Sequence, residues 1–188
     1  MKKLLTITLL SVSVFIASTS AVSAQSAAQS YIEKFKDNAI RIMHETGVPA
    51  SIILGVAMHE SASGKSAIAQ NLNNQFGVKG GGSVVYYKHN KKVRSSYKRY
   101  DNVMDSFKDF ARIMTERKQF SHLADKLTQY DYKGWAKGIQ RSGYASSKKW
   151  SAQVLGIISK YDLNELDDDA VSEETADPQK AELAENNR

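Results

Sequence analysis

Apolar residues recur at helical spacing in several segments of this chain, and polar or glycine-rich stretches separate them. The first segment predicts a helix from Ser30 to Glu45, because its apolar residues lie three or four positions apart. Gly47 is typical of a helix end, and Pro49 is typical of the first turn of a second helix. The stretch from Ser61 to Ser83 is rich in Gly and Asn, so we expect a loop with a few short turns there.

Two short runs in the middle of the chain have the composition of strands. The runs Val84 to Tyr87 and Val93 to Tyr100 are rich in β-branched and aromatic residues, and His89-Asn90-Lys91-Lys92 separates them. This pattern predicts a small β-hairpin.

Helical periodicity returns after the predicted hairpin. Asp101 or Asn102 is expected to cap a helix, whose inward residues would be Val103, Phe107, Phe110, Ala111 and Met114. Shorter helices are predicted around residues 120–127 and 132–139, and a last helix is predicted to start after Ser146. The order of elements predicts one mostly helical α+β domain with a small hairpin lobe.

The second predicted helix carries a glutamate on an apolar stripe. Ile53, Ala57 and Glu60 are spaced so that they share one helical face. Such a carboxyl group either marks where the helix meets solvent, has a structural partner, or is kept protonated for chemistry. Burial raises the pKa of a carboxyl group, and a general acid working near neutral pH needs a raised pKa. The spacing alone favours the first of these interpretations.

The N-terminal residues are typical of a secretory signal peptide. Lys2 and Lys3 precede an apolar run from Leu4 to Ala17, and Val22-Ser23-Ala24 is a small-residue cleavage site. We therefore expect residues 1–24 to be a signal peptide, with no stable membrane insertion after cleavage. The chain has no Cys, which excludes disulfides, thiol catalysis and a lipid anchor on cysteine.

The charge is distributed unevenly along the chain. The formal net charge is +6, yet residues 162–188 hold ten acidic and two basic residues, a net of −8. Subtracting that −8 and the +2 of Lys2 and Lys3 from +6 leaves +12 for residues 25–161. We expect residues 25–163 to be one domain and residues 164–188 to be an acidic, disordered tail. A basic domain suits an anionic partner, and secretion makes nucleic acid the weakest candidate.

Two short motifs each lack one residue that their usual function requires. His59-Glu60 begins like a zinc-protease helix, but the second His would fall at Ser63. Gly64-Lys65-Ser66 ends like a phosphate-binding loop, but the required first Gly would fall at His59. No metal or organic cofactor is implied.

Several motifs together resemble a known family over residues 31–163. In chain order they are Pro49-Ala50-Ser51-Ile52, Glu60-Ser61 with Gly64-Lys65-Ser66, Asn73-Asn74-Gln75-Phe76-Gly77-Val78-Lys79-Gly80, Tyr100-Asp101-Asn102 with Asp105-Ser106-Phe107, and Ser142-Gly143-Tyr144-Ala145. Each motif is weak alone, but five in the same order are a strong signal. The segment resembles the catalytic domain of glycoside hydrolase family 73, bacterial peptidoglycan endo-β-N-acetylglucosaminidases found in flagellar-rod hydrolases and autolysins.

The resemblance implies a lysozyme-like fold, with a helical body, a cleft and a small β-lobe beside it. It also implies cleavage of the β-1,4 bond after N-acetylglucosamine in peptidoglycan glycan strands. The family's catalytic glutamate corresponds to Glu60, and Tyr144 corresponds to a residue near the reaction centre. Asn73, Asn74 and Phe76 correspond to residues of the cleft floor, and Tyr87 is a candidate for stacking on a sugar. Trp135 and Trp150 lie on helical stripes and are expected to be core residues.

The family commonly places a second acid in the β-lobe, but residues 79–100 contain no Asp or Glu. Glycoside hydrolysis usually needs two carboxyl groups. Three accounts stay open: the N-acetyl group of the substrate acts as nucleophile, a distant carboxylate such as Asp101 serves, or the domain binds glycan without efficient cleavage. We favour the first, although Asp101 also suits a helix cap.

Three functional hypotheses follow. The leading one is a periplasmic or secreted peptidoglycan N-acetylglucosaminidase; the others are a non-catalytic wall-binding module and a lytic transglycosylase. The expected partner is the peptidoglycan glycan strand. The sequence does not define the oligomeric state, and a monomer is the working expectation.

Overall fold

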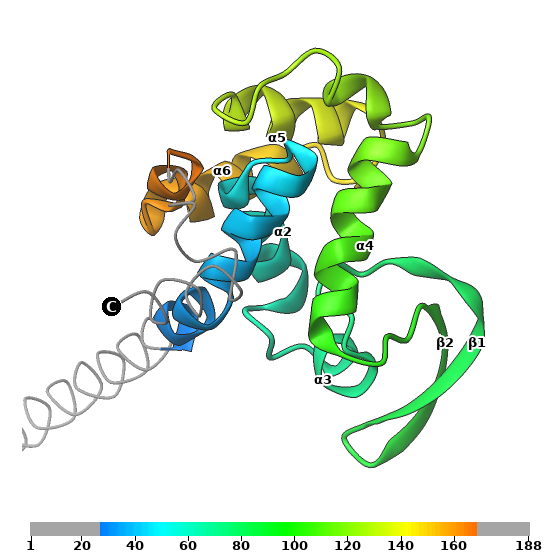
Figure 1. The fold of residues 1–188 in the computed structure, drawn as a ribbon. Coiled ribbons are helices and arrows are strands. Elements are labelled where there is room, and N and C mark those ends of the chain that lie inside the picture. Colours follow the sequence, from blue (N-terminus) through cyan, green and yellow to red (C-terminus); the bar gives the residue numbers. More distant parts are fainter. Residues whose placement is uncertain (1–26, 169–188) are drawn as a thin grey trace, which may run out of the picture.

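The computed structural model describes residues 27–168. The predicted signal peptide, residues 1–24, and residues 169–188 of the predicted tail lie outside this range. The described part is a body of helices from which one β-hairpin projects (Figure 1). The predicted α+β class, mostly helical with a hairpin lobe, is therefore confirmed.

Helix α2 (Ala50–Ser61) is the central element of the body. Its residues from Ala50 to Met58 are all buried, so the helix is enclosed on every side rather than amphipathic as the stripe predicted. Pro49 occupies the N-cap position. Gly55 allows α6 (Trp150–Lys160) to approach closely, because a Cβ on Gly55 would lie 2.9 Å from Cγ1 of Ile158.

The other helices surround α2. The first helix covers residues 27–46, close to the predicted range. The remaining helical elements are α3 (Ala67–Leu72), α4 (Val103–Glu116), the 3-10 helix η1 (Ser121–Leu123), α5 (Tyr132–Arg141), α6 and the 3-10 helix η2 (Leu163–Asp167). Helix α6 begins at Trp150, about one turn later than predicted.

The prediction of a loop from Ser61 to Ser83 is wrong in two places. Helix α3 lies within that stretch, and the first strand already starts at Lys79. Ser66 caps α3 by accepting a hydrogen bond from the Ala69 backbone N–H (3.1 Å). The glycine and asparagine content concealed a six-residue helix, which is too short to show a helical period.

The hairpin consists of β1 (Lys79–Lys88) and β2 (Lys91–Tyr97), paired antiparallel. His89 and Asn90 form the turn between them, and both have positive φ, 49° and 61°. Two central residues with positive φ are typical of the tight turns that match strand twist. Strand β1 is thus longer, and the turn shorter, than the sequence predicted, whereas β2 starts two residues earlier and ends at Tyr97 instead of Tyr100.

Side chains at the base of the hairpin tie it to the body. The Asn74 amide donates to the carbonyls of Val78 (2.9 Å) and Lys98 (2.8 Å) and accepts from the Val78 N–H (3.0 Å). Arg99 donates to the carbonyls of Asn71 in α3 (2.8 Å) and Val85 in β1 (3.0 Å). These bonds fix the direction in which the hairpin leaves the body.

A buried carboxylate joins the end of the hairpin to α4. Asp109 accepts hydrogen bonds from Lys98 Nζ (2.9 Å), Tyr100 Oη (2.7 Å) and Arg112 Nη2 (2.6 Å). Burial opposes ionisation of Asp109, but these bonds lower its pKa overall.

The packed domain extends past the predicted boundary at residue 163. Leu163 and Asp167 of η2 are buried, and Asp167 accepts bonds from the backbone N–H of Ser51 (2.8 Å) and from its hydroxyl (2.6 Å). The acidic composition of this segment concealed these contacts, so residues 164–168 belong to the fold rather than to the tail. Over residues 27–168, none of the helices has the length and apolarity that a membrane crossing requires.

Candidate functional site

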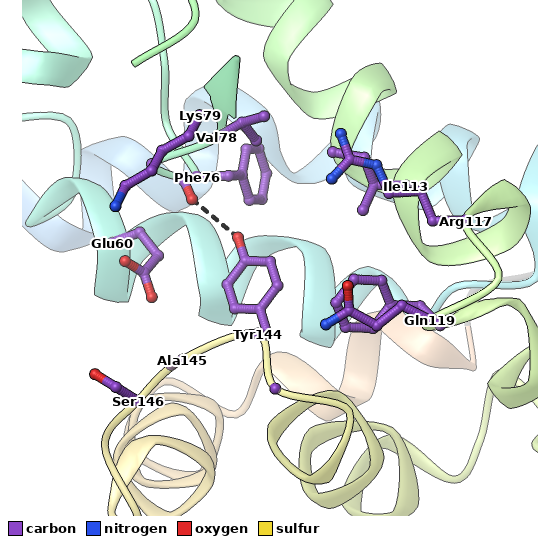
Figure 2. Close-up of a pocket in the computed structure, with 13 residues that line it drawn as sticks. Glu60, Phe76, Val78, Lys79, Ile113, Arg117, Gln119, Tyr144, Ala145 and Ser146 are labelled. Carbon is purple, nitrogen blue, oxygen red and sulfur yellow. Dashed lines mark hydrogen bonds between the residues drawn. The ribbon is translucent and has the colours of Figure 1, made fainter. Parts of the chain in front are cut away.

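A cavity of about 510 Å³ opens between the helical body and the base of the hairpin. Its walls come from the end of α2, the segment between α3 and β1, the C-terminal half of α4 and the connection from α5 to α6. Glu60, Phe76, Gly77, Val78, Lys79, Ile113, Arg117, Gln119, Phe120, Gly143, Tyr144, Ala145 and Ser146 line it, as Figure 2 shows.

Glu60 presents its carboxyl group to the cavity from the last turn of α2. Its Oε1 atom accepts a hydrogen bond from the Trp150 indole N–H at 2.7 Å. A Cβ on Gly77 would lie 3.7 Å from Oε2, so the missing side chain leaves space beside that oxygen. One oxygen of Glu60 is therefore fixed by the protein, and the other accepts no hydrogen bond from residues 27–168.

Tyr144 stands beside Glu60, on the connection between α5 and α6. Its hydroxyl donates a hydrogen bond to the Phe76 carbonyl at 2.9 Å, drawn as a dashed line in Figure 2. Burial, and after it the negative charge of Glu60, raises the pKa of the Tyr144 phenol well above its ordinary value. Tyr144 therefore stays protonated at neutral pH, with its hydrogen directed to Phe76 and its oxygen lone pairs free to accept.

Aromatic stacking holds the backbone at the Phe76–Gly77 peptide in place. The Phe76 ring is 2% exposed and stacks on Phe110 with ring centroids 4.4 Å apart. Tyr144 contacts Trp150 at 5.3 Å between centroids. Phe76 thus contributes its carbonyl to the site, and its ring belongs to the core.

Three other predicted site residues do not line the cavity. The amides of Asn73 and Asn74 are engaged with backbone carbonyls: Asn73 donates to Tyr100 and Asp101 (both 3.1 Å), and Asn74 holds the hairpin base. Tyr87 lies near the hairpin turn and is 61% exposed. The structure therefore brings together Glu60, Tyr144 and Phe76, and roles of Asn73, Asn74 and Tyr87 in substrate binding stay predictions.

Glu60 is the one acidic residue among the side chains that line the cavity in the described part of the chain. Lys79 and Arg117 add positive charge to the walls, and Gln119 and Ser146 add neutral polar groups. No group of His, Asp and Glu within residues 27–168 has the arrangement to hold a metal ion. The chemistry available to these residues is proton transfer by one carboxyl group beside a phenol.

Trp150 is the site residue that sequence reasoning missed. Its helical spacing predicted a core position, and the side chain is indeed only 2% exposed. The indole N–H nevertheless reaches Glu60, which lies 90 positions earlier in the chain. A buried Trp usually finds a partner for its N–H, but the sequence contains no signal that identifies this partner.

A helical body, a hairpin lobe and a cavity with one carboxyl group at the end of a central helix are the features expected of a lysozyme-like glycoside hydrolase. Comparison with known proteins gives the family. The sequence profile of the glucosaminidase family, described as mannosyl-glycoprotein endo-beta-N-acetylglucosaminidase, matches residues 36–163. The chain belongs to this family.

Individual relatives agree with this placement. The exo-glucosaminidase LytG of Bacillus subtilis is 28% identical over 151 residues, which cover 74% of this chain and 54% of LytG. Among solved structures, an N-acetylmuramoyl-L-alanine amidase from Staphylococcus aureus has a TM-score of 0.64 at 23% identity, covering 77% of this chain and 44% of that one. A peptidoglycan hydrolase from Sphingomonas sp. A1 has a TM-score of 0.59 at 23% identity, covering 73% and 92%.

These structural similarities confirm the predicted lysozyme-like fold. The chain spans about half the length of the curated relative, so the match concerns one domain of that protein.

Proposed function

We propose that this protein is a peptidoglycan hydrolase that cleaves the β-1,4 bond after N-acetylglucosamine, with Glu60 as the general acid. The observation that carries the proposal is the Glu60 carboxyl group, held at the cavity wall by Trp150 with one oxygen free. The family and the name of the Bacillus exo-glucosaminidase support the choice of bond, and the name of the Sphingomonas protein supports peptidoglycan as substrate.

In the first step, protonated Oε2 of Glu60 donates its proton to the glycosidic oxygen. The bond between that oxygen and the anomeric carbon breaks, and the oxygen leaves as a hydroxyl group. The acetamido oxygen of the same N-acetylglucosamine bonds to the anomeric carbon and forms a cyclic oxazolinium. Substrate-assisted glycosidases use this route, which needs only one acidic side chain.

In the second step, water attacks the anomeric carbon while the Glu60 carboxylate removes its proton. The bond to the acetamido oxygen breaks, so the acetamido group is restored and the configuration at the anomeric carbon is retained. Glu60 ends the cycle protonated, as it began.

Tyr144 suits the role of orienting the acetamido group. Because its hydrogen is directed to the Phe76 carbonyl, its oxygen is available to accept a hydrogen bond from the acetamido N–H. Such a bond would increase the electron density on the acetamido oxygen, which is the attacking atom. The same oxygen also faces the positive charge that develops on the sugar ring.

Substrate assistance accounts for the absence of a second acid. The hairpin contains no Asp or Glu, and Glu60 is the one acid along the described cavity wall. Asp101 does not line the cavity, so its carboxylate is not placed to act as the second acid.

The proposed site of action is outside the cytoplasm, in the periplasm or after secretion. The signal peptide predicted at residues 1–24 supports this location, as does a wall polymer as substrate. Peptidoglycan glycan strands are the proposed partner, and the protein is proposed to act without a cofactor.

The substitution Glu60→Gln tests the proposal. It keeps the acceptor for Trp150 but removes the transferable proton, so we expect a loss of about 10²–10⁴-fold in the release of reducing ends from purified sacculi. Glu45→Gln, an exposed change on the first helix, is the matched control and should keep full activity. Undiminished release by a folded Glu60→Gln protein would overturn the assignment.

Mass spectrometry of the wild-type products belongs in the same assay. Reducing N-acetylglucosamine ends support hydrolysis, whereas anhydro-muramic ends would show a lytic transglycosylase. The family description supports endo cleavage, and the curated relative is named an exo-enzyme, so the length of the products distinguishes these two modes.

A further inference from the structure

We propose that one face of the β1–β2 hairpin is a second binding surface, which holds the acidic peptides attached to a glycan strand while the cavity holds the strand itself. The surface consists of Tyr87, Lys92 and Arg94, and we call it the cationic hairpin face. Its ligand class is a sugar polymer that carries peptide carboxylates. This inference rests on the proposed function for the identity of the polymer.

The strand register places the three side chains together. Tyr87 pairs with Lys92 and Val85 pairs with Arg94 across the hairpin. Paired residues point to the same face of a sheet, and residues two apart in a strand also share a face. Tyr87, Lys92 and Arg94 therefore form one contiguous group, and all three are exposed.

The opposite face of the hairpin is different in character. There Tyr86 pairs with Val93, and Tyr86 is only 8% exposed. Lys88 and Lys91 pair on that same side next to the turn and are exposed. The cationic hairpin face is therefore distinguished by an exposed tyrosine beside its two cations.

The charges on this face have no acidic partner within the described residues. Residues 79–100 contain seven Lys and Arg residues and no Asp or Glu. Three of the seven have structural partners, because Lys98 binds Asp109, Arg99 binds backbone carbonyls and Lys79 lies over the Tyr97 ring. Lys92 and Arg94 take part in none of the ion pairs found in residues 27–168, so their charge is available to an external anion.

A tyrosine between two cations suits an acidic glycopeptide better than a simple polyanion. An exposed aromatic ring offers a flat apolar surface with a polar tip, against which a sugar or peptide can lie. Arg presents paired donors that match a carboxylate, and Lys adds a second positive charge. A single surface ion pair contributes little in water, so binding requires a polymer that engages several groups at once.

The hairpin connects this face to the cavity. Lys79 lines the cavity and is also the first residue of β1, and Tyr87 lies eight residues further along that strand. Strand β1 bulges between Lys79 and Val84, and the residues of β2 that pair with Lys79 and Tyr87, which are Tyr97 and Lys92, are five residues apart. At about 3.3 Å per residue the separation is roughly 17 Å. A polymer that extends beyond the cavity can reach both places, whereas a saccharide confined to the cavity cannot. Arg99 and Asn74 hold the hairpin against the body, so the cavity and the cationic hairpin face keep a fixed distance and orientation.

Binding is measured with the full chain carrying Glu60→Gln, so that sacculi are not consumed. The test variant adds Tyr87→Ala, Lys92→Gln and Arg94→Gln. The matched control adds Tyr130→Ala, Lys126→Gln and Lys137→Gln. It removes an equally exposed tyrosine, 62% against 61%, and the same two charges from another part of the surface.

We expect the test variant to sediment with peptide-bearing sacculi about tenfold more weakly than the parent, and the control to bind as the parent does. The difference should shrink on glycan strands from which the peptides have been removed, and in high salt, where surface charges are screened. The test variant should keep the far-UV circular dichroism spectrum and the urea midpoint of the parent, which shows that the domain is folded.

Equal losses in the test and control variants would overturn the proposal, as would unchanged binding. An equal loss on peptide-free strands would overturn the role of the carboxylates. A loss confined to teichoic acid or to vesicles of anionic phospholipid would assign the face to a phosphate polymer or a membrane instead. Failure of the proposed function is recognised separately. In that case the Glu60→Gln protein would still release reducing ends from sacculi, whereas the sedimentation results would not change.

Discussion

At the scale of single residues, the two oxygens of Glu60 have different surroundings. Oε1 is bound to the indole N–H of Trp150, and Oε2 lies beside Gly77, where no side chain intrudes. In the proposed mechanism Oε2, the oxygen without a hydrogen bond from residues 27–168, is therefore the one that transfers the proton. Orientation of a catalytic group by a fixed neighbour is a known source of rate enhancement, because the geometry is established before the substrate arrives.

Trp150→Phe tests this positioning role. The ring stays apolar and nearly as large, but the N–H is lost, so Glu60 is no longer fixed. We expect kcat on sacculi to fall about tenfold or more with little change in KM, since the substrate contacts remain. Steady-state kinetics on sacculi measure kcat and KM separately.

Trp135→Phe is the matched control. Trp135 is also fully buried, and its indole N–H donates to the Thr128 carbonyl (3.1 Å), away from the cavity. Both substitutions should lower the free energy of unfolding by about 1 kcal/mol, but only Trp150→Phe should lower kcat. Equal losses of kcat in Trp150→Phe and Trp135→Phe would show that Trp150 contributes packing and does not position Glu60.

At the scale of elements, the turn after Glu60 has an unusual backbone. Ala62, Ser63 and Gly64 follow one another with positive φ, 52°, 52° and 78°. The Ser61 hydroxyl stabilises the turn by donating to the Ala57 carbonyl (2.6 Å) and accepting from the Gly64 N–H (2.7 Å). This compact turn ends α2 directly after the carboxyl group and directs the chain away from the cavity.

Ala62→Gly should stabilise the protein. A residue with a Cβ is strained at positive φ, and Ala62 is exposed, so little packing is lost. We expect the free energy of unfolding to rise by up to about 1 kcal/mol in urea denaturation. Ala152→Gly, at an exposed position in α6, should lower it by a similar amount, because glycine is unfavourable in a helix. A decrease for Ala62→Gly would show that the turn is not strained.

At the scale of the whole molecule, the C-terminal segment closes the fold over the start of the central helix. Asp167 of η2 binds the backbone and hydroxyl of Ser51 in α2, 116 positions earlier. Burial, opposed by the bonds from Ser51, raises the pKa of Asp167 from 3.8 to about 6. The folded protein therefore binds this proton more tightly than the unfolded chain does.

A raised pKa makes stability fall as pH rises. The favourable contribution of the Asp167 proton is fully present below about pH 4 and is lost as pH passes through about 6. Asp167→Asn keeps a neutral polar group opposite Ser51 and cannot ionise. The free energy of unfolding of the parent should fall by about 2 kcal/mol between pH 4 and 7. We expect this decline to be absent in Asp167→Asn, as measured by denaturation across that range.

Asp125→Asn, an exposed acid elsewhere, controls for the change in net charge and should leave the decline in place. A variant at position 167 with the same pH dependence as the parent would show that this carboxyl group does not titrate as described.

The pattern of residues predicted most of the elements because each depends on local chemistry. Asn102, one of the two predicted caps, is the residue that caps α4, its side chain accepting from the Asp105 N–H (3.0 Å), so Asp101 is not the cap. The errors fall where local chemistry is ambiguous: α3 is too short to show a period, and an acidic composition concealed the buried contacts of η2. The motifs also identified the family, since their order along the chain does not depend on knowing the fold.

The arrangement of the site could be determined only from the tertiary structure. The sequence by itself determined the helical body, the hairpin, and the candidate pair Glu60 and Tyr144, which the fold places on one cavity. Only the fold decided that Trp150 binds Glu60, that Asn74 serves the hairpin base, and that Tyr87 lies outside the cavity with two cations. These outcomes depend on contacts between residues far apart in the chain, and packing selects such contacts, whereas periodicity reports only the neighbours within one element.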